Sequence, residues 1–348
     1  MKKRWRIYAS LLTATLLFFG FFPVDKKRAK AEKNHSVSRA ECVMELDSGR
    51  IIYAENAEKR LPMASTTKIL TAVTVLENLK DVTKEFTVPD LAIGIEGSSV
   101  YLKKGDIYTA EDLLYGLMLR SGNDCAVALA LKTGGSLERF SAMMNYTAQK
   151  AGALESNFVT PHGLPHENHY TTAKDLAFIT RYALQNEQFS QIVSCRFYEK
   201  CGWKNKNKML DLFDGAIGVK TGYTKAAGRC LVSAAKRENM TLICVVLGCG
   251  DTYGRSSALL EDGFQSYERV KILSAQTPVE IKIGNKIVTG AVQKDLYYPI
   301  LPEERALIKR EVIGAISDKK TVKKGEIVGQ IKISLLNRLL FFENLYKL

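Results

Sequence analysis

Long apolar segments are missing from this 348-residue sequence. The apolar run at residues 7–22 falls short of the roughly 20 residues that a helix needs to cross a bilayer, so the chain is not expected to be a bundle of membrane helices. Hydrophobic residues are not scarce: 46% of the residues are hydrophobic and 25% are charged, which is ordinary for a globular protein with a sizeable core and does not indicate disorder. The length predicts one large domain and a smaller one.

Negative charge is in the minority, with 37 acidic residues against 50 Lys and Arg and a formal net charge of +13. Eight of the cations lie before residue 31; less Asp25 they account for +7 and leave +6 for the rest of the chain. No recognisable nucleic-acid module accompanies this modest excess, so we expect no nucleic-acid partner. A weakly basic surface that faces an anionic wall or membrane is the better interpretation.

The first residues are typical of a secretory signal peptide. A basic start precedes the apolar run, and the small-x-small triplet Ala29-Lys30-Ala31 follows it. We expect cleavage after Ala31, so that residues 1–31 are a leader and the mature protein is exported. The alternative is a retained membrane anchor.

Seven cysteines cannot all pair within one chain, because their number is odd. Cys125, Cys230, Cys244 and Cys249 lie in apolar runs, where a free thiol behaves as a small buried hydrophobe. Only Cys195 and Cys201 are expected to be both close enough and exposed enough to form a disulfide, and two free thiols are at least as good an interpretation.

The order of elements predicts an α+β domain over residues 32–275. Two strands flank the turn Asp47-Ser48-Gly49 as a β-hairpin, and apolar residues at helical spacing follow Ser65. Further strands are expected late, at residues 217–224, 230–235 and 242–247. Because strands at both ends enclose helices, we expect one antiparallel sheet with helices over both faces.

The carboxyl-terminal part has a different pattern. Strict alternation and scattered Pro and Gly predict a small all-β domain over residues 276–333. In residues 334–348 the apolar side chains recur at helical spacing, which indicates an amphipathic helix lying in a membrane surface. The alternative is a terminal helix packed on its own domain.

Ser65-Thr66-Thr67-Lys68 is the first motif with catalytic potential. Serine needs a base within hydrogen-bonding reach to act as a nucleophile, and residues three apart on a helix share a face. Lys68 can accept a proton only if it is partly neutral, which burial and a nearby cation such as Lys220 would favour. The lysine of an isolated Ser-x-x-Lys is usually a solvated residue on a helix, so a catalytic role depends on the other motifs of the chain.

Ser121-Gly122-Asn123 and Lys220-Thr221-Gly222 follow in a fixed order. Ser121 could relay a proton and Asn123 could hold a substrate amide, although such a sequence alone is most often a turn or helix cap. Lys220 with the Thr221 and Thr224 hydroxyls could bind a terminal carboxylate. The amides of Tyr223 and Ser65 would make a two-donor oxyanion hole, and Gly222 would let a substrate backbone lie close.

Together these motifs resemble the active-site set of the serine penicillin-recognising enzymes. The resemblance is greatest to the D-alanyl-D-alanine carboxypeptidases, the low-molecular-mass penicillin-binding proteins, and extends from about residue 38 to the tail. Pro161-His162-Gly163-Leu164 is similar to that group as well.

The resemblance implies a β-lactamase/transpeptidase-like fold and a specific chemistry. Ser65 would be acylated by the penultimate D-alanine of a peptidoglycan pentapeptide, with Lys68 as proton acceptor, and β-lactams would acylate it as mimics. It further implies that Arg255 assists carboxylate recognition, although a surface arginine is an equal alternative. The enzyme would need no cofactor and would act at the outer face of the bacterial membrane or in the wall.

His162, His166 and His169 raise the possibility of a zinc site, but the resembling family has this loop without metal, and we expect none. Ile217, where many relatives carry aspartate, and His166 depart from the family pattern without removing a catalytic group.

Two alternatives remain open. A serine β-lactamase would use the same motifs, but the Glu-x-x-Leu-Asn stretch of class A enzymes is missing between the second and third motifs. A silent penicillin-binding wall protein would be expected to lose at least one of the motif residues.

Overall fold

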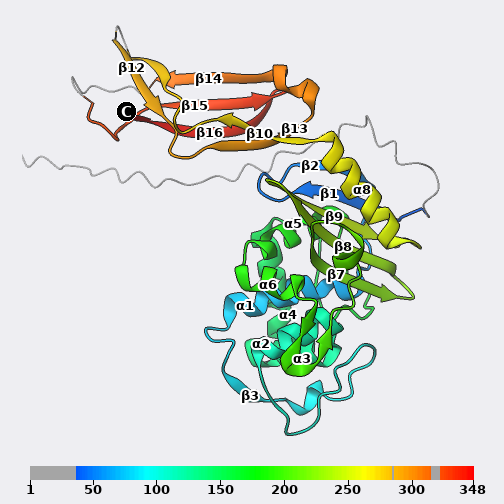
Figure 1. The fold of residues 1–348 in the computed structure, drawn as a ribbon. Helices are drawn as coiled ribbons and strands as arrows, with labels where there is room; N and C mark the ends of the chain where they lie inside the picture. The colour runs from blue at the N-terminus through cyan, green and yellow to red at the C-terminus, as the bar shows by residue number, and fades with distance from the viewer. Residues whose placement is uncertain (1–36, 284–285, 315–321) are drawn as a thin grey trace, which may run out of the picture.

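The computed structural model describes residues 37–283, 286–314 and 322–348 (Figure 1). They form a mixed α+β unit that carries all three motifs and a β-rich unit that follows it, as the sequence predicts. The expected signal peptide, residues 1–31, lies outside the described residues.

A five-stranded antiparallel sheet in the order β2-β1-β9-β8-β7 is the centre of the first unit. The amino-terminal hairpin therefore joins the late strands, and the strand that carries Lys220, β7, lies at the sheet edge. Gly49 closes the hairpin turn with a φ of +68°, a conformation that glycine adopts without a steric penalty. The strands are β1 Ala40–Glu45, β2 Ile51–Glu55, β7 Ala216–Thr224, β8 Gly228–Arg237 and β9 Met240–Leu247.

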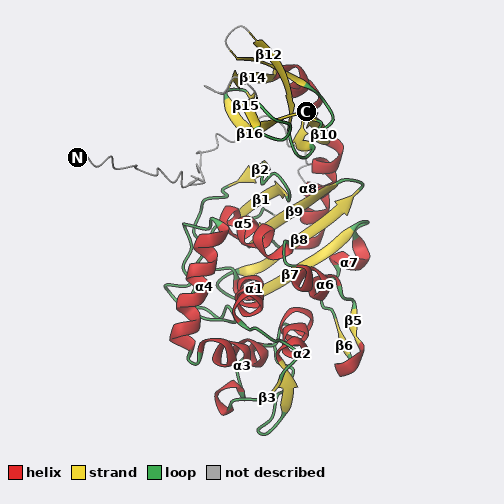
Figure 2. Cartoon of the chain, turned by 90° about the vertical axis from the view of Figure 1, so that its left-hand side faces the viewer, coloured by secondary structure: helices red, strands yellow, loops and turns green. Residues whose placement is uncertain are grey.

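Both faces of this sheet are covered, and β9 shows why (Figure 2). All of its residues are buried, because alternate side chains enter two different hydrophobic clusters. Ile243, Val245 and Leu247 pack on the side of helix α5 (Ala173–Leu184). Leu242, Cys244 and Val246 pack on the opposite side, against helix α8 (Thr252–Ser266).

Apart from α7 (Met209–Leu212), whose Met209 packs in the cluster on the α8 side, the other helices gather on the α5 side of the sheet, away from α8 (Figure 2). Three of them begin at side-chain caps of the expected kind, Ser136, Thr109 and Asn186, each accepting a main-chain N–H. The elements are α1 Lys68–Asn78, α2 Ala110–Tyr115, α3 Asn123–Gly134, α4 Leu137–Ala151, α6 Glu187–Ser194 and α7 Met209–Leu212, with the small hairpins β3 Glu85–Thr87/β4 Ile107–Thr109 and β5 Phe197–Tyr198/β6 Trp203–Lys204.

The second unit is all β and has its own apolar core, which includes Ile281, Ile331 and Leu345. Its larger sheet has the order β11-β12-β16-β15-β14, and a separate pair joins β10 to β13. Because β10 pairs with β13, this unit begins directly after α8, earlier than the boundary expected after residue 275. The strands are β10 Glu268–Leu273, β11 Val279–Ile283, β12 Lys286–Ala291, β13 Leu296–Ile300, β14 Ile308–Gly314, β15 Ile327–Leu335 and β16 Arg338–Lys347.

The expected amphipathic helix in residues 334–348 is wrong, because this segment is strand β16. Leu336 and Asn337 both have positive φ values, 49° and 66°, and form the two-residue turn that reverses the chain between β15 and β16. A bulge in the pairing leaves Leu339 and Phe342 both exposed, so their helix-like spacing arises from a shift of strand register.

Arg50 joins the two units: it lies in the turn between β1 and β2, and its side chain extends into the β-rich unit. Its guanidinium makes two hydrogen bonds to the Glu304 carboxylate, at 2.8 and 2.6 Å, and one to the Pro299 carbonyl at 2.7 Å. The same group lies over the rings of Tyr267 and Tyr298; the Glu304 side chain is buried and that of Arg50 is largely so.

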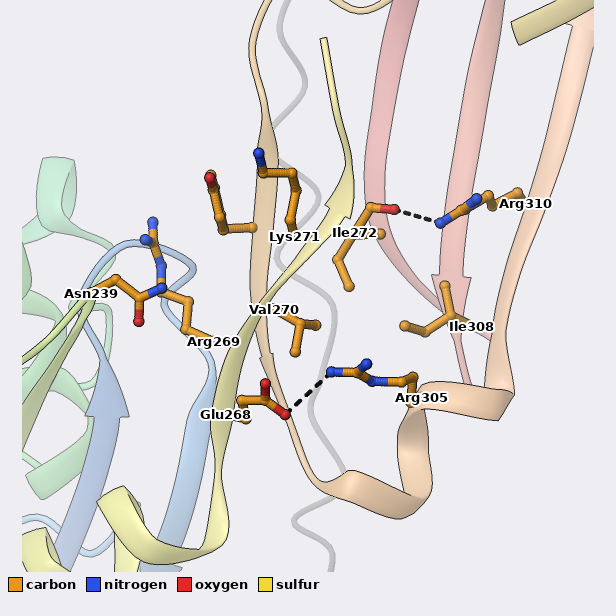
Figure 3. Close-up of a pocket in the computed structure, with 10 residues that line it drawn as sticks. Asn239, Glu268, Arg269, Val270, Lys271, Ile272, Arg305, Ile308 and Arg310 are labelled. Atoms are coloured by element: carbon orange, nitrogen blue, oxygen red, sulfur yellow. Dashed lines mark hydrogen bonds and ion pairs between the residues drawn. The ribbon is translucent and has the colours of Figure 1, made fainter. Parts of the chain in front are cut away.

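A groove of about 550 Å³ lies beside this junction, between β10 and the segment that leads into β14 (Figure 3). Its cationic side chains already have partners: Arg305 pairs with Glu268, Arg310 donates to the Ile272 carbonyl, and Lys271 pairs with Asp295. We therefore interpret the groove as part of the junction between the two units.

Candidate active site

Ser65 lies where the chain enters helix α1. The short 3₁₀ turn η1 (Ala64–Thr67) runs directly into α1, so Ser65 and Lys68 lie one turn apart. Lys68 Nζ is 2.9 Å from Ser65 Oγ, as the Ser-x-x-Lys spacing predicts. Ser65 is partly exposed and Lys68 is fully buried, so the nucleophile is accessible while its partner is shielded from water.

Lys68 Nζ has two further partners, the Asn123 Oδ1 atom and the His162 carbonyl, each at 2.7 Å. The Asn123 amide orientation is consistent with this, because its Nδ2 donates to the Glu96 carbonyl. Both partners of Nζ can only accept hydrogen bonds. A neutral Lys68 would therefore donate its two N–H groups to the Asn123 Oδ1 atom and the His162 carbonyl, and its lone pair would point at Ser65 Oγ.

The electrostatics favour this neutral form. Burial is the main cause that lowers the pKa of Lys68 well below its usual value, and the positive charge of Lys220 lowers it further. Burial, with a contribution from Lys206, also lowers the pKa of Lys220, to about 7. The two lysines of the site therefore differ in acidity: the pKa of Lys68 is lowered by the charge of Lys220, and that of Lys220 by the charge of Lys206.

The second motif is held in a strained geometry. Ser121 is buried and has a φ of +64°, which is disfavoured for a residue with a side chain and is often found at functional sites. It ends the turn Gly116–Arg120, and Asn123 then begins α3. A Cβ on Gly122 would lie 2.8 Å from both the Asp124 carboxylate and the Cys125 sulfur, so the motif needs glycine here.

The third motif brings β7 against the start of α1. A Cβ on Gly222 would lie 3.1 Å from the main-chain nitrogens of Ser65 and Thr66, which shows how closely the strand approaches the nucleophile. Lys220 is buried, and its Nζ donates to the Thr221 carbonyl at 2.8 Å. Thr221 is half-buried beside it, whereas the Tyr223 side chain is exposed.

Thr224 has a local role that the sequence did not indicate. Its Oγ1 accepts a hydrogen bond from the Ala227 N–H at 3.1 Å and so supports the turn between β7 and β8. The structure therefore brings together Ser65, Lys68 and Asn123 by direct hydrogen bonds and places Gly222 against them.

Arg255 is not brought into this group. It lies on α8 and makes two hydrogen bonds to the Glu41 carboxylate, at 2.8 and 2.7 Å. Strand register places Glu41 three strand spacings from Thr221, or about 14 Å. The interpretation of Arg255 as a carboxylate ligand is thus not supported, because its charge is already paired on the far side of the sheet.

Two contributors to the site escaped the sequence analysis. One is the main-chain carbonyl of His162, which carries no side-chain signal. The other is Asp124, whose buried carboxylate accepts from Ser99 Oγ and from the N–H groups of Val100 and Leu102. Asp124 thereby holds the loop that supplies the Glu96 carbonyl to Asn123.

Two histidines of the neighbouring loop, His162 and His169, are buried and favour the neutral form. Burial lowers the pKa of His162 to about 4 and that of His169 to about 3. Within the described ranges, no group of three or more His, Cys, Asp or Glu side chains is arranged to hold a metal. Cys195 and Cys201 are both free thiols.

A serine and a buried lysine at the start of a helix, beside the edge strand of a helix-covered antiparallel sheet, define a serine penicillin-recognising enzyme. The sequence matches the protein family described as D-alanyl-D-alanine carboxypeptidase over residues 26–251. The chain belongs to this family.

Individual relatives agree with that assignment. The chain is 31% identical over 299 residues to the D-alanyl-D-alanine carboxypeptidase DacF of Bacillus subtilis, covering 80% of this chain and 76% of that protein. The crystal structure of penicillin binding protein 5 from Haemophilus influenzae is similar with a TM-score of 0.75 and 29% identity, over 91% of this chain and 98% of that one. The carboxypeptidase DacD from Francisella tularensis gives a TM-score of 0.71 at 26% identity, over 94% and 96%.

Proposed function

We propose that this chain removes the terminal D-alanine from peptidoglycan pentapeptide stems through an acyl-enzyme on Ser65. The observation that carries the proposal is the set of contacts around Lys68 Nζ, which directs a lone pair at Ser65 Oγ once the amine is neutral. Membership of the carboxypeptidase family supplies the substrate class.

In the acylation step, Ser65 Oγ attacks the carbonyl carbon of the penultimate D-alanine and its proton passes to Lys68 Nζ. The N–H groups of Ser65 and Tyr223 stabilise the oxyanion. When the C–N bond breaks, Ser121 relays the proton from Lys68 to the amine of the departing D-alanine. Water then attacks the ester and gives a proton to Lys68, and Lys68 returns this proton to Ser65 Oγ as the ester C–O bond breaks and the shortened stem leaves.

Selection of a chain end follows from Lys220. A buried cation has few ways to satisfy its charge, so a substrate carboxylate placed against it is strongly favoured. Thr221 and Thr224 add hydroxyl donors at the same edge strand, and Asn123 holds the substrate amide. β-Lactams carry a carboxylate at the corresponding place and would acylate Ser65 as mimics.

The protein would act outside the cytoplasm, at the outer face of the membrane or in the wall, with no nucleic-acid partner. The leader-like residues 1–31 and the basic excess support this location. No helix in the described part of the chain is long and apolar enough to cross a membrane. Exposed Leu339 and Phe342 on β16 support a peripheral contact with the membrane surface.

The test is the release of D-alanine from a peptide ending in D-Ala-D-Ala, with Ser65→Ala as the matched variant. We expect release by the wild type and a loss of at least about 10³-fold in the variant, since removing the nucleophile leaves only the oxyanion hole and binding. A fluorescent penicillin should label the wild type, and mass spectrometry should place the adduct on Ser65.

Other outcomes would favour the alternatives. Rapid turnover of nitrocefin would indicate a β-lactamase. Labelling without release of D-alanine would indicate a silent penicillin-binding protein, and an adduct on another residue would remove Ser65 from its role.

A further inference from the structure

A buried chain of hydrogen bonds ends at the residue before the nucleophile. His169 Nδ1 accepts the N–H of Val159 at 2.9 Å, so the ring proton of the neutral histidine is on Nε2. Nε2 lies 2.9 Å from Thr67 Oγ1, and this hydroxyl donates to the Ala64 carbonyl at 2.8 Å. The direction of donation is therefore His169 to Thr67 to Ala64.

The last bond acts on the peptide unit that carries the Ser65 N–H. The carbonyl of Ala64 and the N–H of Ser65 belong to one planar trans peptide, so they point in opposite directions. A donor that fixes the carbonyl fixes the N–H as well. It also polarises the amide, which makes the N–H a stronger donor.

This peptide unit needs support, because Ala64 has a φ of +51°, in the left-handed region that residues with a side chain disfavour. The loop that contains Gly163 closes over the same carbonyl. A Cβ at Gly163 would lie only 2.0 Å from the Ala64 oxygen and 2.8 Å from Thr67 Oγ1. Close packing around this carbonyl leaves Thr67 in position to direct it.

His169 is suited to the task because it is 4% exposed and stays neutral. Burial lowers its pKa to about 3, so one ring nitrogen keeps accepting from Val159 while the other keeps donating to Thr67. Phe158 packs edge-on against the ring and restricts its rotation.

We propose that His169 and Thr67 are positioning residues for the oxyanion hole, which hold the Ala64–Ser65 peptide so that the Ser65 N–H points at the developing oxyanion. The inference rests on the proposed acyl transfer at Ser65. Neither residue touches the substrate; both act through the peptide of the nucleophile.

Thr67→Val tests this, because it removes the hydroxyl at nearly constant volume. We expect the acylation rate constant for penicillin and kcat for the peptide to fall about tenfold, less than the roughly 10²–10³ lost with a whole oxyanion donor. KM should change by less than about twofold. Thr67→Ser keeps the hydroxyl and should restore acylation to within about threefold of the wild type.

The chain offers a matched control at the adjacent position. Thr66 Oγ1 donates to the Met63 carbonyl at 2.7 Å, an equally buried bond that acts on the Ala64 N–H rather than on the Ser65 N–H. Thr66→Val should therefore lose a similar amount of thermal stability while its acylation rate stays within about twofold of the wild type.

A boronic acid analogue of the D-alanine substrate supplies a readout that general destabilisation would not move. Its tetrahedral adduct with Ser65 places an oxygen in the oxyanion hole, so Thr67→Val and His169→Phe should weaken its binding by the same factor as the acylation rate. His169→Gln, which can still donate to Thr67, should recover part of the loss.

The outcomes separate the two proposals. If wild-type Ser65 is not acylated by penicillin, the proposed function and this inference both fail. If the wild type is acylated and folded Thr67→Val matches it in rate and boronate affinity, only the positioning role is overturned. Equal losses in Thr66→Val and Thr67→Val would also overturn it, and the His169 variants decide the matter should Thr67→Val not fold.

Discussion

Lys68 and Lys220 are both buried lysines, but their neighbours differ. The proposed mechanism uses Lys68 as the base and Lys220 as the cation that binds a carboxylate. Lys68 faces three oxygen atoms, one of which belongs to the nucleophile, whereas Lys220 is hydrogen-bonded to a single main-chain carbonyl. A lysine that must accept a proton benefits from a second cation nearby, and Lys220 contributes that charge. Under the proposed mechanism, the site is active only while Lys68 is neutral and Lys220 is charged.

The dependence of kcat/KM on pH should reflect the different protonation states required of Lys68 and Lys220. Activity should rise with pH as Lys68 loses its proton, because the neutral amine is the base. Activity should then fall as the pH rises through the pKa of Lys220, about 7, because a neutral Lys220 no longer holds the substrate carboxylate. Lys220→Arg keeps its charge above this range and should move the alkaline limb upward. An unchanged alkaline limb in that variant would show that another group titrates there.

Much of the site was predictable at this scale, since the motif order placed Ser65, Lys68 and Asn123 together and the structure joins them by hydrogen bonds. Arg255 was misplaced, because a local Gly-Arg pattern carries no information on which face of a sheet its helix covers. The role of the His162 carbonyl could not be read from side chains at all.

At the scale of elements, the approach of β7 to η1 controls the geometry of the nucleophile. Glycine at position 222 lets the two backbones approach closely, because a Cβ there would lie 3.1 Å from Ser65 N and would push the main chain apart by a few tenths of an ångström. The strands that build this sheet follow the alternation in the sequence, which is why they were predictable. Strand β16 was not, because a bulge shifted its exposed residues to a helix-like spacing.

Gly222→Ala should therefore lower the acylation rate about tenfold, because the added methyl group pushes on main-chain atoms that include an oxyanion donor. Gly263→Ala is the matched control. Its Cβ would meet the ends of Leu242 and Ile52 on the other side of the sheet, at 2.7 and 3.0 Å. It should lower the melting temperature without changing acylation, and equal acylation by Gly222→Ala and wild type would contradict the argument.

At the scale of the whole molecule, a buried ion pair couples the catalytic unit to the β-rich unit. Arg50 and Glu304 come from different units, and their side chains are 11% and 6% exposed. Removing one partner leaves a buried charge without compensation, which typically costs about 3–5 kcal/mol.

Arg50→Met should consequently make the β-rich unit unfold at a lower temperature than the catalytic unit, so that calorimetry resolves two transitions. Penicillin labelling of Ser65 should persist. Arg60→Met is the control, since the exposed Arg60–Glu155 pair is worth only about 0–1 kcal/mol. Adding Glu304→Leu to Arg50→Met should recover part of the stability, and a single unshifted transition in Arg50→Met would show that the pair does not couple the units.

The pairing of β1 with β9 has a consequence for the order in which the molecule becomes competent during its synthesis. Ala40 lies opposite Leu247, so the central strands of the catalytic sheet cannot assemble until almost the whole catalytic unit has been made. Contacts between such distant parts of a chain form late and slowly. Ser65 is made early but has no finished site around it, so the nascent chain can stay inert until the sheet has closed.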